Sequence, residues 1–318
     1  MLHALRSTLA RVQPVVVAAA FVFLALLLQR QWSALTEQQW TVRPLWLLLS
    51  GCAIVGGWLL EIRMWQLLLV RLQQRLPYPT AIGVWLASAI VRYVPGNIWQ
   101  PLSLSARCRV LGVRPEATLA SLSLYHIIHI LSVGPIAAVY IAGWGPTSGL
   151  PGAIAGASPW WAIVIGAAVA FFLLRPDVLL RAGNRLLTSV GRDPLPLSLT
   201  TSSLIALMGL SLLAWVAFAG GFAALVYALQ PEGGWPQTAL PHILAAYPLA
   251  FAVGFLSLIT PSGLAVREGA LILLLERHLG GTAAIVVALS MRVWEIALDA
   301  LVSVVALVWW RRSGLDRQ

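Results

Sequence analysis

The chain has 318 residues, of which 59% are apolar and only 10% are charged, and its mean hydropathy is +0.85. These values exclude a soluble globular domain and are typical of a helical membrane protein. The formal net charge is +10, but all 21 basic residues are arginine, so we interpret the charge as membrane topology signal and do not expect a nucleic-acid partner. Cys52 and Cys108 show neither disulfide nor metal-site spacing. We therefore expect an all-α polytopic membrane protein without a metal or another cofactor.

Spanning helices are predicted where an apolar run is long enough to cross the hydrocarbon layer, which needs about 20 helical residues. The sequence contains six such segments, at residues 12–29, 45–62, 117–142, 159–174, 199–229 and 282–310. The first follows Arg6 and Arg11 and resembles a signal peptide, but no small-x-small cleavage site comes after it. We therefore expect this segment to be a spanning helix as well.

Two further apolar segments, residues 80–106 and 242–279, are interrupted by proline and glycine beside an arginine. The first contains Arg92-Tyr93-Val94-Pro95-Gly96-Asn97, and the second contains Thr260-Pro261-Ser262-Gly263-Leu264-Ala265-Val266-Arg267-Glu268. Only 12 uncharged residues precede Arg92 in its segment, which is about 18 Å of helix and too short to cross. We predict two oppositely oriented re-entrant hairpins, the first opening to the cytoplasm and the second to the outside, although residues 242–259 alone are long enough to span.

The distribution of arginine predicts the orientation of the chain. If each broken segment returns to the face from which it entered, one side carries fifteen arginines, at positions 6, 11, 63, 71, 75, 107, 109, 114, 175, 181, 185, 192, 311, 312 and 317. The other side carries three, Arg30, Arg43 and Arg277. By the positive-inside rule both termini are expected in the cytoplasm, which places a multi-pass protein in a bacterial or archaeal cytoplasmic membrane.

The predicted segments also form an internal repeat. Residues 1–142 contain span, span, hairpin (80–106) and span, and residues 159–318 contain the same unit with the hairpin at 242–279, joined by an external loop at 143–158. Every direction is reversed in the second unit, so we predict an inverted-topology repeat of about eight membrane segments. Transporters with such repeats bind their substrate near the midplane, where the broken helices meet.

Six ionisable residues fall inside the predicted membrane segments, and each costs about 2.5 to 3.5 kcal/mol at the bilayer centre. They are Arg92, Arg267, Glu268, Arg292, Glu295 and Asp299. The spacing of the last three predicts that they share one helical face, which must point inward. Three arginines and three carboxylates sum to zero, so a buried ion network that only holds the bundle together and a binding site for an anion both remain open.

For the anion site, Arg92 is the first candidate, because it has no acidic neighbour in sequence, whereas Arg267 has Glu268 and Arg292 has Glu295. A guanidinium group matches a phosphate with two parallel donors. The proline and glycine residues that interrupt the two segments leave backbone N–H groups without a helical partner. A helix that begins after such an interruption has a positive N-terminal end, which favours anions. The candidate substrate-binding residues are Arg92, Pro95, Gly96, Asn97, Pro261, Gly263, Arg267, Glu268 and Arg292.

Proton coupling is a second hypothesis, because an electroneutral site that accepts an anion gains negative charge unless a carboxylate takes up a proton. Glu295 and Asp299 lie one turn apart and are the natural candidates. His126 and His129 are also one turn apart, and either a proton relay or core histidines bonded to a neighbouring helix would explain them. Glu61 is expected to form a solvated pair with Arg63 at the cytoplasmic interface.

The two broken segments resemble those of the flippase-like membrane family related to the transmembrane region of lysylphosphatidylglycerol synthase. The resemblance rests on Arg92-x-x-Pro95-Gly96, followed by a basic stretch and Leu111-Gly112, and on the run from Pro261 to Glu268 with Arg292 beyond. The second signature usually reads Pro-Gly-Gly-(Leu/Ile)-Gly-x-x-Glu in the family, so Ser262 and Ala265 are departures.

The resemblance implies a role in moving a phosphate-bearing lipid between leaflets, with the breaker residues, Glu268 and Arg292 lining the headgroup site. The lipid is either a modified phospholipid or a polyprenyl-linked intermediate. Only six residues follow Arg312, so we expect no aminoacyl-transfer domain. The outer loop 143–158 carries no charge and residues 230–241 carry only Glu232, so we expect no catalytic residue either. Two alternatives stay open: a membrane-embedded transferase acting on polyprenyl-phosphate sugars, and a non-catalytic partner of a lipid-modifying enzyme. A homodimer is also open.

Overall fold

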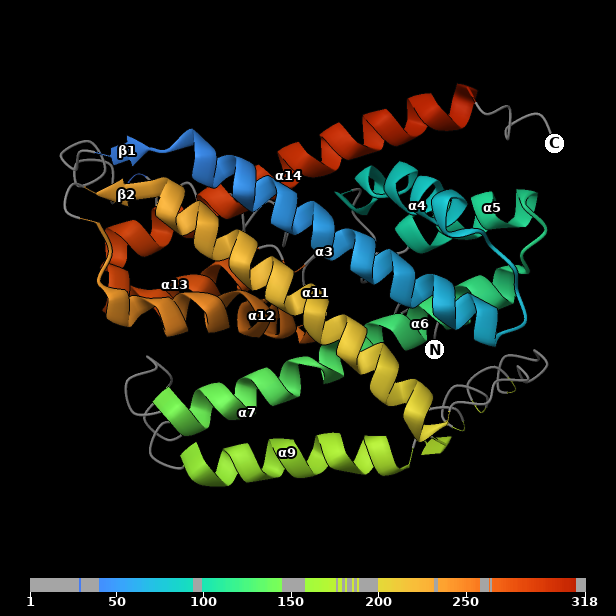
Figure 1. The fold of residues 1–318 in the computed structure, drawn as a ribbon, viewed down its shortest axis with the longest axis horizontal. Coiled ribbons are helices and arrows are strands. Elements are labelled where there is room, and N and C mark those ends of the chain that lie inside the picture. The colour runs from blue at the N-terminus through green and yellow to red at the C-terminus, as the bar shows by residue number, and fades with distance from the viewer. Residues whose placement is uncertain are drawn as a thin grey trace, which may run out of the picture.

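The computed structural model describes residues 40–93, 99–144, 158–175, 200–231, 234–257 and 265–312, and single residues at 29, 177, 178, 181, 185, 188 and 263. The elements, with η for 3₁₀ helices, are β1 (Trp40–Val42), α3 (Pro44–Arg71), α4 (Tyr78–Ala87), η1 (Ile90–Tyr93), α5 (Trp99–Val110), α6 (Pro115–Leu131), α7 (Val133–Trp144), α9 (Ser158–Leu174), α11 (Thr201–Ala228), β2 (Leu229–Pro231), η3 (Gln237–Ala239), α12 (Leu240–Leu256), α13 (Val266–Leu279) and α14 (Gly281–Arg312). Apart from the two three-residue strands, the described elements are helical (Figure 1). This confirms the predicted all-α membrane fold.

Five helical stretches of the described chain are long and apolar enough to cross a bilayer: Pro44–Arg71, Pro115–Trp144, Thr201–Ala228, Gln237–Leu256 and Gly281–Trp310. Four of them contain predicted spans, and the fifth lies in the segment predicted as the second hairpin. The predicted span at 159–174 falls on α9, which has 17 residues. The predicted span at 12–29 lies outside the described residues, except for Gln29.

The centre of the fold is the antiparallel pair of α3 and α11, each 28 residues long (Figure 1). β1 precedes α3, β2 follows α11, and the strands pair antiparallel with Trp40 opposite Pro231, which ties these helix ends together. The helices pack closely because glycine lines their contact: a Cβ on Gly57 would lie 2.5 Å from a Phe218 ring carbon, and one on Gly221 would lie 2.8 Å from Ile54.

The predicted span at 117–142 divides into α6 and α7, with the break at Ser132. Pro135 explains the division, because proline has no N–H for the carbonyl four residues back and its ring crowds that carbonyl. After the break α7 packs against α9, where a Cβ on Gly134 would lie 2.6 Å from Val169. The break therefore allows α7 to change direction relative to α6 and to pack along α9.

The two broken segments lie at opposite ends of the molecule in Figure 1, with α4 and α5 at the right and α12 and α13 at the left. α4 and α5 have 10 and 12 residues, or about 15 and 18 Å of helix, so neither crosses a bilayer alone. α12 and α13 pack against each other. Residues 94–98 and 258–262 lie outside the described chain, so the re-entrant hairpins stay a prediction.

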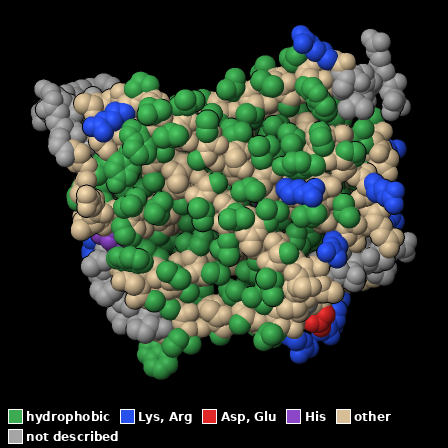
Figure 2. All heavy atoms as spheres, in the orientation of Figure 1, with side chains coloured by type: hydrophobic (Ala, Val, Ile, Leu, Met, Phe, Trp, Pro, Cys, Tyr) green, Lys and Arg blue, Asp and Glu red, His purple; other side chains and the backbone are tan. Residues whose placement is uncertain are grey.

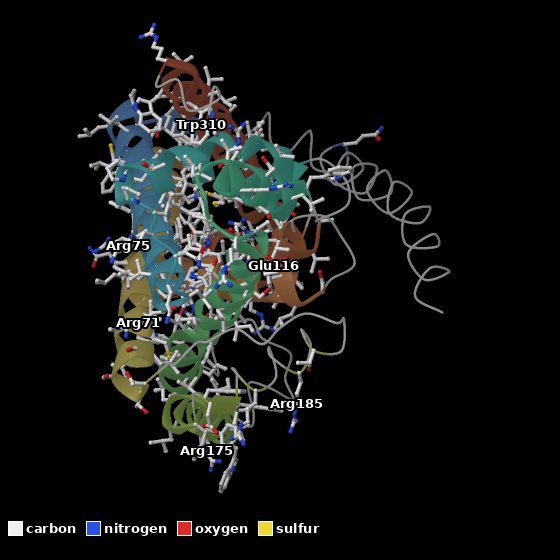
Figure 3. All side chains as sticks on the ribbon, turned by 90° about the vertical axis from the view of Figure 1, so that its right-hand side faces the viewer. Arg71, Arg75, Glu116, Arg175, Arg185 and Trp310 are labelled. Carbon is white, nitrogen blue, oxygen red and sulfur yellow. The ribbon has the colours of Figure 1, made fainter. Side chains whose placement is uncertain are left out.

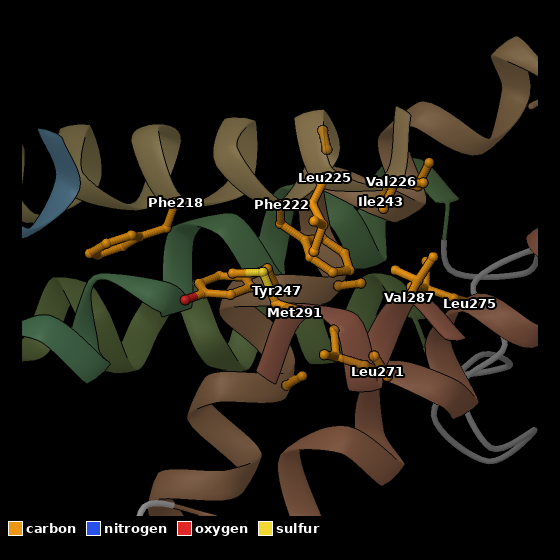
Figure 4. Packing of buried hydrophobic residues seen from close by; sticks show 14 of the residues in the cluster. Phe218, Phe222, Leu225, Val226, Ile243, Tyr247, Leu271, Leu275, Val287 and Met291 are labelled. Atoms are coloured by element: carbon orange, nitrogen blue, oxygen red, sulfur yellow. The ribbon is translucent and has the colours of Figure 1, made fainter. Parts of the chain in front are cut away.

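The buried apolar side chains form two large clusters. One joins α3, α11, α12, α13 and α14, and includes Phe222, Tyr247 and Met291 (Figure 4). The other joins α3 with α4, α5, α6 and α11 around Trp65 and Trp85. Side chains of both clusters line a cavity at their junction.

The outer surface is largely apolar between the two ends of the molecule. In Figure 2 apolar side chains cover most of the visible face, and arginine side chains lie mainly toward the right-hand end. Figure 3 views that end directly, with Arg71, Arg75, Arg175 and Arg185 labelled. An apolar belt bounded by charged ends is the surface that a bilayer covers, so the structure agrees with a multi-pass membrane protein.

Candidate functional site

A cavity of about 340 Å³ lies in the interior and receives side chains from both broken segments. Val91, Arg92 and Trp99 line it from the first, and Gly254, Gly263 and Arg267 line it from the second. Its other charged lining residues are Glu61, Arg292, Glu295 and Asp299. Two segments that lie far apart in sequence therefore converge on one polar cavity, as the breaker motifs predict.

The charged side chains on α14 share the face that the sequence predicts for them. Arg292, Glu295 and Asp299 all line the cavity. The side chain of Asp299 is 2% exposed and that of Glu295 is 11% exposed. Such buried carboxylates require cationic or hydrogen-bonding partners, since an isolated charge is costly away from water.

Arg267 and Glu295 form the strongest of the ion pairs. The guanidinium donates to both carboxylate oxygens, at 3.0 and 2.7 Å, and the Tyr247 hydroxyl donates to the same carboxylate at 2.5 Å. The guanidinium carbon also lies 4.5 Å from the centre of the Tyr247 ring and 5.5 Å from that of Phe251. This pair connects α13 to α14. Hydrogen bonds and ring contacts fix the positions of the Arg267 guanidinium and the Glu295 carboxylate.

The other two arginines face carboxylates in looser contacts. Arg292 lies 3.7 Å from Glu268, and Arg92 lies 3.6 Å from Asp299. The expected local pairing of Arg267 with Glu268 and of Arg292 with Glu295 is therefore wrong. Arg267 and Glu268 are adjacent on a helix, so they point about 100° apart and do not face each other. Arg292 and Glu295 are neighbours on one face of α14, but they contact Glu268 and Arg267 on α13.

Arg92 is the most accessible guanidinium of the three. Its side chain is 28% exposed, against 9% for Arg267 and 12% for Arg292. It follows α4 on the short helix η1, and its Nε donates to the Ala89 carbonyl at 3.2 Å. The residue that sequence reasoning placed first for a phosphate thus has the greatest access to the cavity.

Glu61 was expected to be solvated beside Arg63, and the structure overturns this. Glu61 is buried and lines the cavity, while Arg63 is exposed and donates to Gln66 at 2.8 Å. Glu61 instead faces His129, whose Nε2 lies 2.9 Å from Oε1, and it is hydrogen-bonded to the Tyr125 side chain. The two residues point to different sides of α3, which separates the buried acid from the exposed base.

The two predicted histidines have different surroundings. His129 is buried and bonded to neighbouring helices, as one of the two readings proposed, with Nδ1 2.9 Å from Ser211 and its ring stacked on Trp215. His126 lines the cavity, and its Nδ1 donates to the Leu122 carbonyl at 2.8 Å, because a carbonyl can only accept. Of these two histidines, only His129 has a ring nitrogen within 4 Å of a carboxylate oxygen among the described residues.

The breaker residues are only partly described. Pro95, Gly96, Asn97 and Pro261 lie outside the described residues. Gly263 lines the cavity at φ +68°, and a Cβ there would lie 3.0 Å from the Gly254 Cα. Glycine is favoured at position 263, because its φ is positive and a side chain there would crowd the Gly254 backbone.

Aromatic side chains form much of the cavity wall. Sequence reasoning did not select them, since an aromatic residue inside an apolar run carries no signal that separates a cavity wall from ordinary core. They are Trp58, Trp85, Trp99, Tyr125, Trp215, Phe218, Tyr247, Phe251 and Phe255. A cavity lined by both arginine and aromatic side chains is suited to a ligand that has a charged part and an apolar part.

Comparison with known proteins yields one family. The family model described as the lysylphosphatidylglycerol synthase TM region matches residues 12–306. No protein of curated function matches the chain. The match covers both broken segments and every charged residue around the cavity.

Proposed function

Because this chain belongs to the lysylphosphatidylglycerol synthase TM region family, we propose that it translocates an anionic, phosphate-bearing lipid between the two leaflets. The observation that carries the proposal is the partly open cavity lined by three arginines, of which Arg92 is the most exposed. A modified phospholipid and a polyprenyl-linked intermediate share the phosphate chemistry that such a site would recognise.

The headgroup would bind first at Arg92. Its contact with Asp299 is long, at 3.6 Å, so a phosphate that offers two oxygens to the guanidinium can compete for it. Arg292 faces Glu268 at 3.7 Å and would be the second donor. Arg267 is already held by both oxygens of Glu295 and would serve mainly to keep the wall of the cavity in place.

The path across the membrane follows from where the two broken segments lie. In our proposal they are re-entrant hairpins that enter from opposite faces and meet at the cavity, and each opens it to one leaflet. The antiparallel pairing of α3 with α11 supports an inverted repeat, because these helices hold corresponding places in the two predicted units.

The orientation would follow the arginines. We propose that the end with Arg71, Arg75, Arg175 and Arg185 (Figure 3) faces the cytoplasm, in a bacterial or archaeal cytoplasmic membrane. The end that carries β1 and β2 would then face outward.

The test is leaflet exchange by the purified protein in vesicles. The probes are a fluorescent anionic phospholipid and a fluorescent polyprenyl phosphate, and the variants are Arg92→Ala and Glu268→Gln. Arg75→Ala is the control, because Arg75 is exposed and outside the cavity. We expect exchange by the wild type and by the control, and its loss in Arg92→Ala, which changes a cavity-lining residue, and in Glu268→Gln, which removes the carboxylate that faces the cavity-lining Arg292.

No exchange of either probe by folded wild-type protein would overturn the translocase and favour the transferase or the partner subunit. Exchange that neither Arg92→Ala nor Glu268→Gln lowers would mean that the headgroup passes elsewhere. Loss with one probe only would identify which phosphate-bearing lipid the cavity accepts.

A further inference from the structure

A second hollow lies beside the cavity, between α6, α9 and α12, and we call it the lateral groove. Its volume is about 600 Å³, against about 340 Å³ for the cavity. Five of its described lining residues come from α6, including Ile127 and Ile130. Phe172 lines it from α9, and Phe255 and Leu256 line it from α12. Three helices therefore frame a groove that is larger than the cavity.

The lining of the lateral groove is apolar. Ser123 and His126 are the polar residues in its described lining. The Ser123 hydroxyl donates to the Leu119 carbonyl at 3.0 Å, and Nδ1 of His126 lies 2.8 Å from the Leu122 carbonyl. Both contacts are made within α6, so these atoms are directed to the backbone of their own helix. A groove of this kind is suited to a hydrocarbon ligand.

The lateral groove opens to the outside of the molecule at the depth of the hydrocarbon layer. Ile127 is 42% exposed, Phe255 is 37% exposed and Leu256 is 64% exposed. Ile130 lies near the middle of Pro115–Trp144, a stretch of 30 residues that is long and apolar enough to cross a bilayer. In a bilayer crossed by this stretch, the chains of the surrounding lipids reach the groove from the side.

The lateral groove and the cavity meet at one pair of rings. His126 and Phe255 line both of them. The two rings stack, with centroids 5.3 Å apart and planes inclined by 16°. On the cavity side the same lining includes Arg92. A ligand that lies across this ring pair therefore has an arginine on one side and apolar side chains on the other.

The volume of the cavity shows why a lipid would need both spaces. A site for a small molecule has a volume of about 300 to 1,000 Å³, and the cavity, at about 340 Å³, is near the lower end of that range. It can hold a headgroup, but a lipid that also has long chains exceeds it. We propose that the lateral groove holds a hydrocarbon chain of the phosphate-bearing lipid whose headgroup is in the cavity, an inference that rests on the proposed translocase.

This arrangement keeps each part of the lipid in surroundings that suit it. The chain enters sideways from the bilayer and stays among apolar side chains, while the phosphate is held by arginine. The chain also adds affinity, because burial of about two methylene groups already strengthens binding about tenfold. The site should therefore select lipids over free phosphate compounds.

The first measurement is photocrosslinking in phosphatidylcholine vesicles. The probe is an anionic phospholipid with a diazirine in one acyl chain, and the labelled positions are identified by mass spectrometry. We expect labelling at Ile127, Ile130 and Leu256. An excess of the same lipid without the diazirine should lower this labelling, and so should Arg92→Ala, because the chain is held there through its headgroup.

Leu119 provides the internal control for photocrosslinking. It lies on α6, is 41% exposed and is outside the linings of the cavity and the groove. It should meet only bulk lipid, so neither the competing lipid nor Arg92→Ala should change its labelling. Labelling in the groove that behaves like that of Leu119 would overturn the proposal.

The second measurement is leaflet exchange by a matched pair of variants. Ile127 and Leu119 are both on α6 and are 42% and 41% exposed, but only Ile127 lines the groove. We expect Ile127→Trp, which fills the groove, to lower exchange of the anionic phospholipid about tenfold, as the loss of about two buried methylene groups would. Leu119→Trp should exchange like the wild type. Unfolding temperatures check that both variants are folded.

The outcomes separate the groove from the translocase. Exchange by the wild type that is equal in folded Ile127→Trp and Leu119→Trp would overturn the groove and leave the translocase standing. Labelling of the groove that depends on Arg92, in a protein that exchanges no lipid, would overturn the translocase and leave a lipid-binding site. A groove that is not labelled, because another part of the chain or a second copy covers it, would also overturn the proposal.

Discussion

Arg267 and Glu295 face each other through two parallel hydrogen bonds, although 28 residues separate them along the chain. Both are buried, so each neutralises a charge that the protein interior would otherwise leave unpaired. This pair joins the second broken segment to the helix that carries most of the charged wall of the cavity.

Breaking this pair should destabilise the protein strongly. We expect Arg267→Met or Glu295→Met alone to cost about 3 to 5 kcal/mol, because each leaves a buried charge without its partner. The double variant should recover most of that loss, since both charges are gone. Thermal unfolding in detergent measures the effect, with exposed Arg277→Met as the control. If Arg267→Met and Glu295→Met were as stable as Arg277→Met, the Arg267–Glu295 pair would not stabilise the fold.

Two adjacent glycines test the packing of α3 against α11. A Cβ on Gly57 would lie 2.5 Å from Phe218, whereas one on Gly56 would meet nothing within 4 Å. We expect Gly57→Ala to destabilise by about 1 to 3 kcal/mol through overpacking. Gly56→Ala should stabilise by up to about 1 kcal/mol through helix propensity. Equal unfolding temperatures for the two variants would argue against the close contact.

Ala265 occupies a backbone conformation that favours glycine. It precedes α13 with φ +67°, where the motif of the resembled family usually has glycine. We expect Ala265→Gly to stabilise the protein by about 1 kcal/mol, because a side chain at positive φ costs about that much. Gly263→Ala should have the opposite effect, since its Cβ would approach the Gly254 backbone. Unfolding temperatures of the two variants would decide this, and a less stable Ala265→Gly would contradict it.

Replacing Arg92 with lysine tests how the headgroup is held. Lysine keeps the charge but cannot offer two parallel donors to a phosphate. We expect Arg92→Lys to lower exchange of the anionic probe about tenfold, the effect of losing about 1.4 kcal/mol, and Arg92→Ala to lower it further. Arg75→Lys is the matched control. Full activity of Arg92→Lys would mean that Arg92 supplies only charge.

Much of the polar site was accessible from the sequence. Arg92, Arg267 and Arg292 stand out because charged residues are rare in apolar segments, and all three line the cavity. Glu61 was misjudged because it lies two residues from Arg63 near the end of an apolar run, where a surface pair is the ordinary expectation. A spacing of two residues on a helix already directs the two side chains about 200° apart. The sequence does not show which of the two faces packs against other helices.

Hydropathy, helix length and the cost of buried charge are local properties. They were therefore enough to predict the membrane class, most of the long helices, the two breaks and the identity of the intramembrane charges. Which acid faces which arginine, and that His129 meets Glu61 across two helices, could be learned from the tertiary structure alone. Those relationships depend on side-chain direction and on contacts between segments far apart in the chain, and partner choice between buried charges is set by that packing.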